Sequence, residues 1–224
     1  MSYYLEIALL LTALAFFSIV SVKKKSLDWA GVLIANVVGL SIFYFGGLQF
    51  FFIAVLFFIV AEGGTRFAAS KKPVPHGRRT IGNIFGNSGV AVIALLLGYP
   101  IAFFGAMAAA LADTLSSELG MLSPTKPVLI TTLEQVPVGT NGGITGLGMW
   151  SALAGSLVIA TIHFVLYQNF YIFMVLVLAG FFGSAVDSFF GAVFERKKLF
   201  GNTEVNFLGS SAGALLAYVL WLFL

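Results

Sequence analysis

The sequence contains no cysteine and only two histidines, His76 and His163. A chain without cysteine forms no disulfide, offers no thiolate nucleophile and builds no zinc–thiolate centre. Two histidines are too few for a histidine-rich metal site. Charged residues are also scarce, at 9% of the chain, whereas an ordinary soluble domain has about 25%. These shortages exclude several classes of metal and redox protein and indicate that water is not the solvent of the folded chain.

Hydrophobic residues are correspondingly abundant. They make up 59% of the 224 residues, and the mean hydropathy is +1.01. Apolar runs recur along almost the whole length with short polar breaks between them, which is typical of packed membrane-spanning helices. We therefore predict an all-α fold, a polytopic transmembrane helix bundle that forms a single integral membrane domain over residues 1–224.

The apolar runs predict about eight spans, with seven as the alternative count. Runs of about 15 residues reach only about 22 Å as helices, less than a hydrocarbon core of about 30 Å, so a re-entrant segment is the competing interpretation. The predicted spans are residues 3–21, 29–45, 48–62, 84–98, 101–118, 147–167, 170–192 and 206–224.

The charges divide the connections into two groups. The breaks at 46–47, 98–100 and 167–169 carry no charge, whereas the other connections hold every Lys and Arg of the chain. Basic residues collect on the cytoplasmic side of membrane proteins. This segregation favours eight spans, with both chain ends outside and the polar connections in the cytoplasm.

Two carboxylates, Asp113 and Asp187, lie inside otherwise apolar helices, which makes each a functional candidate. From the outer ends of their helices they lie about 18 Å and about 26 Å deep, so both belong to the cytoplasmic half. Two such carboxylates on closely packed helices provide the oxygen ligands that Mg²⁺ prefers. The alternative is that each Asp only pairs with Arg or bonds to hydroxyl groups for packing.

Glu118 and Glu62 are further candidate ligands for the metal. Glu118 follows Asp113 by five residues, about 140° around an intact helix, so the two share an ion only if the helix frays near Gly120. Glu62 precedes Arg66 by four residues, and an ion pair within the helix is the alternative for it.

A glycine-rich segment, residues 139–143, precedes the sixth predicted span. Such a turn can point successive backbone N–H groups at a phosphate, and a helix that begins just after it adds a favourable dipole. No Gly-Lys-Ser or Gly-Lys-Thr string is present, so the segment is not a Walker motif.

Two cytoplasmic segments resemble each other at a constant offset, each joining a basic run to a small-residue helix. Parallel duplication is one interpretation, and chance in a glycine-rich chain is the other. Together with Lys126 they place cations and amides, both ligands for anions, on one face. The matched residues are Arg79, Gly82, Asn83 and Asn87 in the first segment and Lys198, Gly201, Asn202 and Asn206 in the second.

The segment at 112–120 (Ala-Asp-Thr-Leu-Ser-Ser-Glu-Leu-Gly) is followed by Ile-Thr-Thr at 130–132 and Gly-Thr-Asn-Gly-Gly at 139–143. With these motifs, and with Gly183-Ser184 and Asp187-Ser188 further on, the chain resembles domain-of-unknown-function family 92. That family includes transmembrane protein 19 and the plant phytyl-phosphate kinase. The resemblance covers roughly the last two thirds of the chain, and Glu134 departs from the basic residue expected at its position.

The resemblance implies a membrane-bound polyprenyl-phosphate kinase that uses CTP, or another NTP, to convert an isoprenyl monophosphate of phytyl or geranylgeranyl type into the diphosphate. On this interpretation Asp113, Asp187, Glu118 and Glu62 hold Mg²⁺, and Lys126 and Arg79 join the catalytic group. The expected contacts to nucleotide and phosphate are Asn83, Asn87, Thr114, Ser117, Thr131, Thr132, Gly139, Thr140, Asn141, Gly142, Gly143, Asn202 and Asn206.

Two other functions compete with the kinase. The tentative repeat and the intramembrane aspartates also fit a secondary transporter, although coupling sites of transporters usually lie near the membrane midplane. Another lipid phosphotransferase or a phosphatase would use the same metal with a different donor or acceptor. In each case we expect an integral protein of a prokaryotic cell membrane that contacts membrane lipids and no nucleic acid, in an oligomeric state left open.

Overall fold

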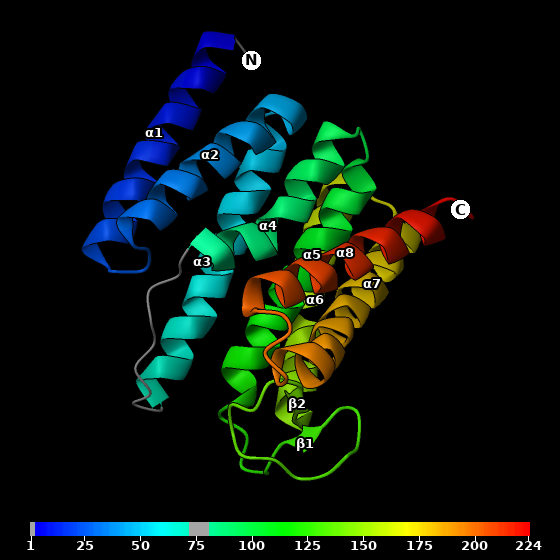
Figure 1. Ribbon diagram of the computed structural model, residues 1–224. Helices are drawn as coiled ribbons and strands as arrows, with labels where there is room; N and C mark the ends of the chain where they lie inside the picture. Colours follow the sequence, from blue (N-terminus) through cyan, green and yellow to red (C-terminus); the bar gives the residue numbers. More distant parts are fainter. Residues whose placement is uncertain (1–2, 72–80) are drawn as a thin grey trace.

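The computed structural model describes residues 3–71 and 81–224, which form a bundle of eight α-helices (Figure 1). A π-helical turn extends the seventh helix, and two short antiparallel strands lie in the connection between α5 and α6. The helices are α1 Tyr3–Lys23, α2 Trp29–Gly46, α3 Leu48–Lys71, α4 Ile81–Leu96, α5 Pro100–Gly120, α6 Gly146–Tyr167, α7 Phe170–Phe190 and α8 Asn202–Trp221. The π-helical turn η1 is Gly191–Glu195, and the strands are β1 Val128–Leu129 and β2 Gly143–Ile144.

The predicted all-α membrane fold is confirmed, with one helix for each predicted span. Six of the described helices, α1, α2, α3, α5, α6 and α7, are long and apolar enough to cross a membrane. The apolar part of α4 is shorter, and α8 begins with the polar residues Asn202, Thr203 and Glu204. Length and apolar composition therefore support six crossings by themselves, while α4 and α8 pack as a pair inside the bundle.

One predicted boundary is wrong by more than two turns of helix. The third span was expected to end at Glu62, but α3 continues through Gly63 and Gly64 to Lys71. Hydropathy marks where a helix leaves the apolar layer, whereas backbone hydrogen bonds continue into the polar region beyond it. The polar end of α3 therefore reaches the level of the basic connections.

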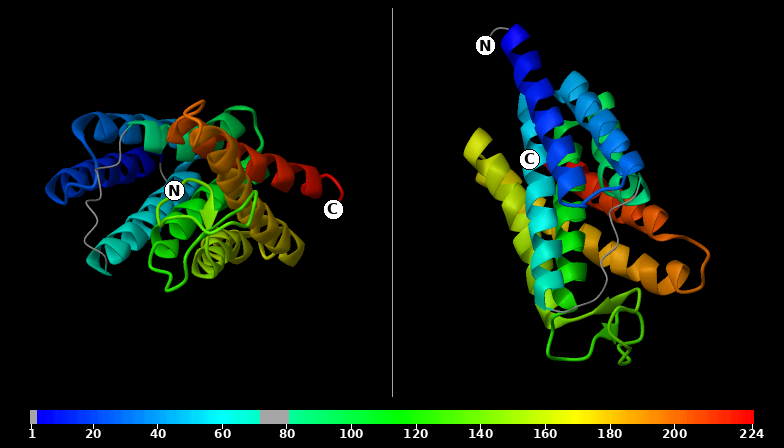
Figure 2. Two further views of the ribbon diagram at one scale, coloured as in Figure 1. Left: turned by 60° about the horizontal axis from the view of Figure 1, so that its bottom comes forward. Right: turned by 90° about the vertical axis from the view of Figure 1, so that its left-hand side faces the viewer.

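Helix α5 is the centre of the bundle. An 18-residue window of it is 72% buried, compared with 17% for the corresponding window of α1. It packs against α3, α4, α6, α7 and α8, and alanine is the commonest of its buried residues. Small side chains allow helices to approach closely where no water drives them together. In the left view of Figure 2 the connection that contains β1 and β2 lies in front of this central region.

Glycines on α5 and on its neighbouring helices allow the backbones to approach closely. A Cβ added at Gly105 would lie 2.6 Å from the Gly213 carbonyl oxygen of α8, and one added at Gly155 of α6 would lie 2.8 Å from the Ala112 Cα. A Cβ at Gly183 of α7 would overlap the Ala109 side chain. Glycine and alanine thus form the close contacts between these helices.

Candidate active site

A polar pocket lies at one end of the bundle, where the ends of α5 and α7 meet the start of α8. It contains about 1030 Å³ of open space, part of it open to solvent, and the connection between α5 and α6 forms one wall. Figure 1 shows this end below, next to β1 and β2, with the C-terminal ends of α3, α5 and α7 directed toward it. The pocket is therefore built from segments that are far apart in the sequence.

Asp113 of α5 and Asp187 of α7 both line this pocket, and a side-chain hydrogen bond joins them. Their contact follows from the packing of the two helices, because Gly183 packs against Ala109 one helical turn before each aspartate. Gly209 of α8 is also small enough to touch Asp187, where an added Cβ would lie 2.9 Å from the Asp187 Cβ. The predicted approach of the two carboxylates is present in the structure.

Glu195, in the π-helical turn, is a third carboxylate of the same pocket. Its side chain forms a hydrogen bond with Asn141 and lies close enough to both aspartates for mutual repulsion. Among the described lining residues there is no Lys or Arg to balance this charge. Carboxylates held so close together favour a bound cation or a shared proton.

Asparagines connect the aspartates to the start of α4. Asn206 is buried on α8, and with its amide nitrogen turned toward Asp187 it donates to Oδ2 at 3.1 Å and to the Asn202 carbonyl oxygen at 3.2 Å. The Asn83 amide on α4 donates to Asn202 Oδ1 at 3.1 Å. The two segments that resemble each other in sequence therefore meet in space, with one asparagine of each in direct contact.

The glycine-rich turn forms the wall opposite the aspartates. Gly139 and Gly142 have φ values of +85° and +77°, the left-handed region that favours glycine. Asn141 and Gly142 line the pocket, and their N–H groups donate no hydrogen bond to another residue of the described chain. Helix α6 begins at Gly146, and the Thr145 hydroxyl caps it by accepting from the Gly148 N–H at 3.0 Å. Both N–H groups belong to the segment that leads into α6, and backbone N–H groups of such segments can bind anions.

The same turn is attached to α7 through the π-helical turn. A Cβ at Gly142 would overlap Ala192, and one at Gly191 would lie 3.2 Å from the Gly142 backbone nitrogen. This contact joins the turn to the helix that carries Asp187. The position of the turn relative to the aspartates is therefore set by backbone packing.

The structure brings most of the predicted site residues together. Besides the aspartates, the pocket is lined by Ser117, Glu118, Gly139, Thr140, Asn141, Gly142, Gly143 and Asn202. Thr114 is buried in the helix packing and does not line the pocket. Thr131 and Thr132 are exposed beyond β1, and Lys126 is exposed beside the lining residues Thr125 and Pro127. Arg79 lies outside the described residues.

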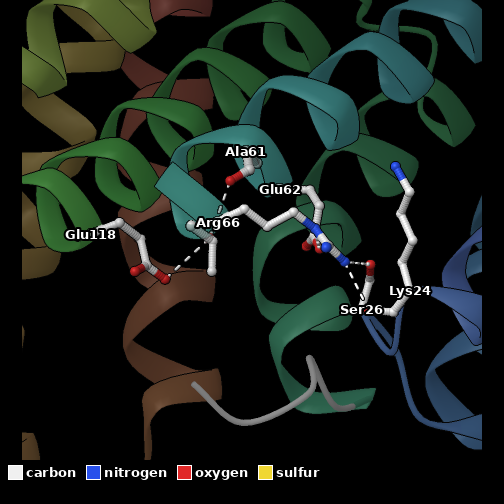
Figure 3. Close-up of polar contacts among 7 residues, drawn as sticks. Lys24, Ser26, Ala61, Glu62, Arg66 and Glu118 are labelled. Atoms are coloured by element: carbon white, nitrogen blue, oxygen red, sulfur yellow. Dashed lines mark hydrogen bonds and ion pairs between the residues drawn. The ribbon is translucent and has the colours of Figure 1, made fainter. Parts of the chain in front are cut away.

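Glu62 and Glu118 do not join the aspartates around one ion. Glu62 forms an ion pair with Arg66 at 2.7 Å, as its i,i+4 spacing allows, and Arg66 also donates to the Lys24 carbonyl oxygen (Figure 3). Helix α5 stays intact to Gly120, and Glu118 accepts a hydrogen bond from Thr65 of α3 at 3.1 Å. Across residues 3–71 and 81–224, no three acidic or histidine side chains are grouped closely enough to hold a metal. The predicted four-carboxylate site is thus not assembled.

Sequence reasoning missed Glu195 and Thr145 as pocket residues. Glu195 follows Asp187 by eight residues, a spacing that does not place two side chains together on an α-helix. The π-helical turn changes that relation, and such turns are frequent at functional sites. For Thr145 a signal was present, since Thr directly before a helix that starts with glycine is a common N-cap.

The sequence as a whole is similar to one protein family and to several proteins within it. Residues 12–214 match the model of the family described as integral membrane protein DUF92. An uncharacterized membrane protein of Methanocaldococcus jannaschii is 32% identical over 208 residues, which cover 89% of this chain and 87% of that protein. Protein PGR of Arabidopsis thaliana is 28% identical, over 78% of this chain and 74% of its own length. The chloroplastic protein VTE6 of Arabidopsis thaliana is 24% identical, over 88% of this chain and 66% of its own length. No solved structure matches.

Proposed function

This chain belongs to the integral membrane protein family DUF92, and on that premise we propose that it is a phosphotransferase for lipid phosphates. The specific activity proposed is transfer of the terminal phosphoryl group of CTP, or another NTP, to an isoprenyl monophosphate of phytyl or geranylgeranyl type. The product is the isoprenyl diphosphate. This choice of substrate is supported by the similarity to VTE6 and by the resemblance of the sequence motifs to a family that includes the plant phytyl-phosphate kinase.

One observation carries the proposal: a contacting carboxylate pair lines the same pocket as Asn141 and Gly142, whose backbone N–H groups donate no hydrogen bond to another described residue. The N–H groups of Asn141 and Gly142, beside the start of α6, suit phosphate oxygens. The carboxylates alone would repel those oxygens. A divalent cation held by the two carboxylates would offset this repulsion, as in other sites that bind nucleotide phosphates.

The described residues fit Mg²⁺ in this role. Asp113 and Asp187 offer carboxylate oxygens in contact with each other, and Mg²⁺ is usually held by one or two carboxylates together with waters and substrate phosphates. The lack of a third carboxylate grouped with the pair is therefore compatible with Mg²⁺. When bound, Mg²⁺ would neutralise charge on the phosphate oxygens during transfer.

The reaction needs little from the protein beyond position and charge. An oxygen of the lipid monophosphate forms the new bond to the terminal phosphorus, and the bond from that phosphorus to the bridging oxygen breaks, leaving the nucleoside diphosphate. The acceptor is already an anion, so no strong general base is required. Ser116 and Ser117 line the pocket, where their hydroxyl groups can orient phosphate oxygens.

A secondary transporter remains the competing function. Its coupling site would usually lie near the membrane midplane, whereas the polar pocket here lies at one end of the bundle. A lipid phosphatase would use the same residues with water as the acceptor. Analysis of the lipid product separates all three activities.

The test is incubation of the purified protein in detergent with Mg²⁺, geranylgeranyl or phytyl monophosphate, and CTP, ATP, GTP or UTP in separate reactions. Mass spectrometry should detect the isoprenyl diphosphate and its loss when EDTA removes the metal. Asp113→Asn and Asp187→Asn should each lower the rate at least about 100-fold, comparable to loss of one group that stabilises the transition state.

Asp28→Asn is the matched control, because it makes the same chemical change at the N-cap of α2, where Asp28 accepts from the Gly31 N–H. Asn caps a helix about as well as Asp, so this variant should keep its activity. Folded protein that makes no diphosphate with any pair of substrates would contradict the kinase, and release of inorganic phosphate and free alcohol would indicate a phosphatase.

A further inference from the structure

A second cavity lies inside the membrane-spanning part, between α1, α2, α3, α4 and the centre of α5. Its enclosed part is small, about 80 Å³, within about 690 Å³ of space that includes the open surroundings, and its lining is almost entirely hydrocarbon. Phe17, Val38, Phe51, Phe58 and Met107 come from four of these helices and face it. An apolar lining of this kind suits an apolar ligand.

The polar residues of the cavity are gathered on α4. Asn83, Asn87 and Ser88 line it there. Asn87 is only 7% exposed, and it lines the cavity together with its neighbour Ser88. The amide and hydroxyl groups can form hydrogen bonds with a ligand, so this end of the cavity suits a ligand with a polar group.

Asn83 connects this cavity to the polar pocket. It lines the apolar cavity, and its amide donates to Asn202, which lines the pocket of Asp113 and Asp187. Helix α5 runs past both spaces, with Met107 in the apolar cavity and Asp113 in the polar pocket. Six residues of helix separate these two by about 9 Å along its axis. One amphiphile can therefore occupy both spaces.

We propose that the apolar cavity holds the hydrocarbon chain of the lipid monophosphate, with the phosphate at Asn83 and Asn202 and facing the aspartates. The inference rests on the proposed function for the identity of the headgroup. It adds the location of the hydrocarbon chain, which lies among the first four helices and α5, away from the outer faces of α6 and α7.

The direct test is photocrosslinking of the detergent-purified protein with farnesyl monophosphate that carries a diazirine at the far end of its chain. Peptide mapping should place the label on α2 or α3, and unlabelled geranylgeranyl monophosphate should compete with it. Label on the outer faces of α6 or α7, or label that no competitor reduces, would overturn the proposed location.

A filled cavity provides the second test. Ala35 on α2 lines the cavity, whereas Ala30 on the same helix is exposed and does not. Ala35→Phe should raise KM for geranylgeranyl monophosphate about tenfold, the effect of displacing roughly two methylene groups, and should leave KM for dimethylallyl monophosphate unchanged. Ala30→Phe, which adds the same volume outside the cavity, should change neither value.

The two proposals fail in different ways. Competed label on α2 or α3 without formation of diphosphate would keep the lipid site and refute the kinase. Alternatively, the protein could turn over both long-chain and short-chain substrates, with Ala35→Phe reducing both rates equally or changing neither. That result would support the kinase and refute the proposed location of the hydrocarbon chain.

Discussion

Gly139 and Gly142 have the same unusual backbone conformation but different surroundings. Both have φ near +80° (+85° and +77°), where an L-residue costs about 1–2 kcal/mol. A Cβ at Gly139 would meet nothing within 4 Å, whereas one at Gly142 would overlap Ala192 of the π-helical turn. We expect Gly142→Ala to lower the free energy of unfolding by about 1–3 kcal/mol more than Gly139→Ala, because only the former adds a steric conflict.

Thermal unfolding of the two variants in the same detergent measures this difference. Equal losses would mean that backbone conformation accounts for the whole effect and that the turn is not packed against α7. The difference in stability between the two variants therefore shows whether the glycine-rich turn packs against the helix that carries Asp187.

At the scale of helices, close packing of α5, α7 and α8 brings the aspartates together. A Cβ at Gly183 would overlap Ala109 and lie 2.7 Å from the Gly209 carbonyl oxygen, but one at Gly63 of α3 would meet nothing within 4 Å. We expect Gly183→Ala to destabilise the protein by about 1–3 kcal/mol through overpacking. Gly63→Ala should stabilise it by up to about 1 kcal/mol, since alanine favours the helix over glycine.

Unfolding midpoints in detergent test the pair, and the rate of diphosphate formation adds a second measurement. Gly183→Ala should also lower that rate, because the Gly183 contact lies one turn before Asp113 and Asp187. A Gly183→Ala variant as stable and as active as the parent protein would contradict the close contact of α5 and α7.

The whole molecule has one polar end, and the basic connections predict that this end is cytoplasmic. Because the chain has no cysteine, single cysteines introduced at exposed Gln135 and Gln49 are the only thiols. Gln135 lies in the connection at the polar pocket, and Gln49 lies at the start of α3, next to the uncharged turn after α2. In intact cells a membrane-impermeant maleimide should label Gln49→Cys and should label Gln135→Cys only after permeabilisation.

The reverse labelling pattern would place the polar pocket outside the cell, where nucleotides are scarce, and would remove the basis for a nucleotide-dependent kinase. Labelling of both positions in intact cells would mean that an even number of segments crosses the membrane between them. Either result can be distinguished from poor folding by comparing the amount of each variant in the purified membrane fraction.

The helices, the polar end and the two aspartates could all be predicted because each depends on a local property. The length of an apolar run decides where a helix fits the bilayer, and basic residues collect at one end whatever the helix contacts are. The order of apolar and basic segments along the chain was therefore enough to predict eight helices. The intramembrane positions of Asp113 and Asp187 needed no more than that.

The partners of the individual carboxylates depended on packing between residues distant in the sequence. Glu62 pairs with Arg66 on the extended end of α3, Glu118 bonds to Thr65, and Glu195 enters the pocket through a π-helical turn. None of these follows from α-helical spacing or from hydropathy, because side-chain direction near a helix end depends on the neighbouring helices. The length of the apolar segments and the charge of their connections determined that the chain forms a membrane helix bundle. The glycine contacts among α5, α7 and α8 determined which two carboxylates lie together.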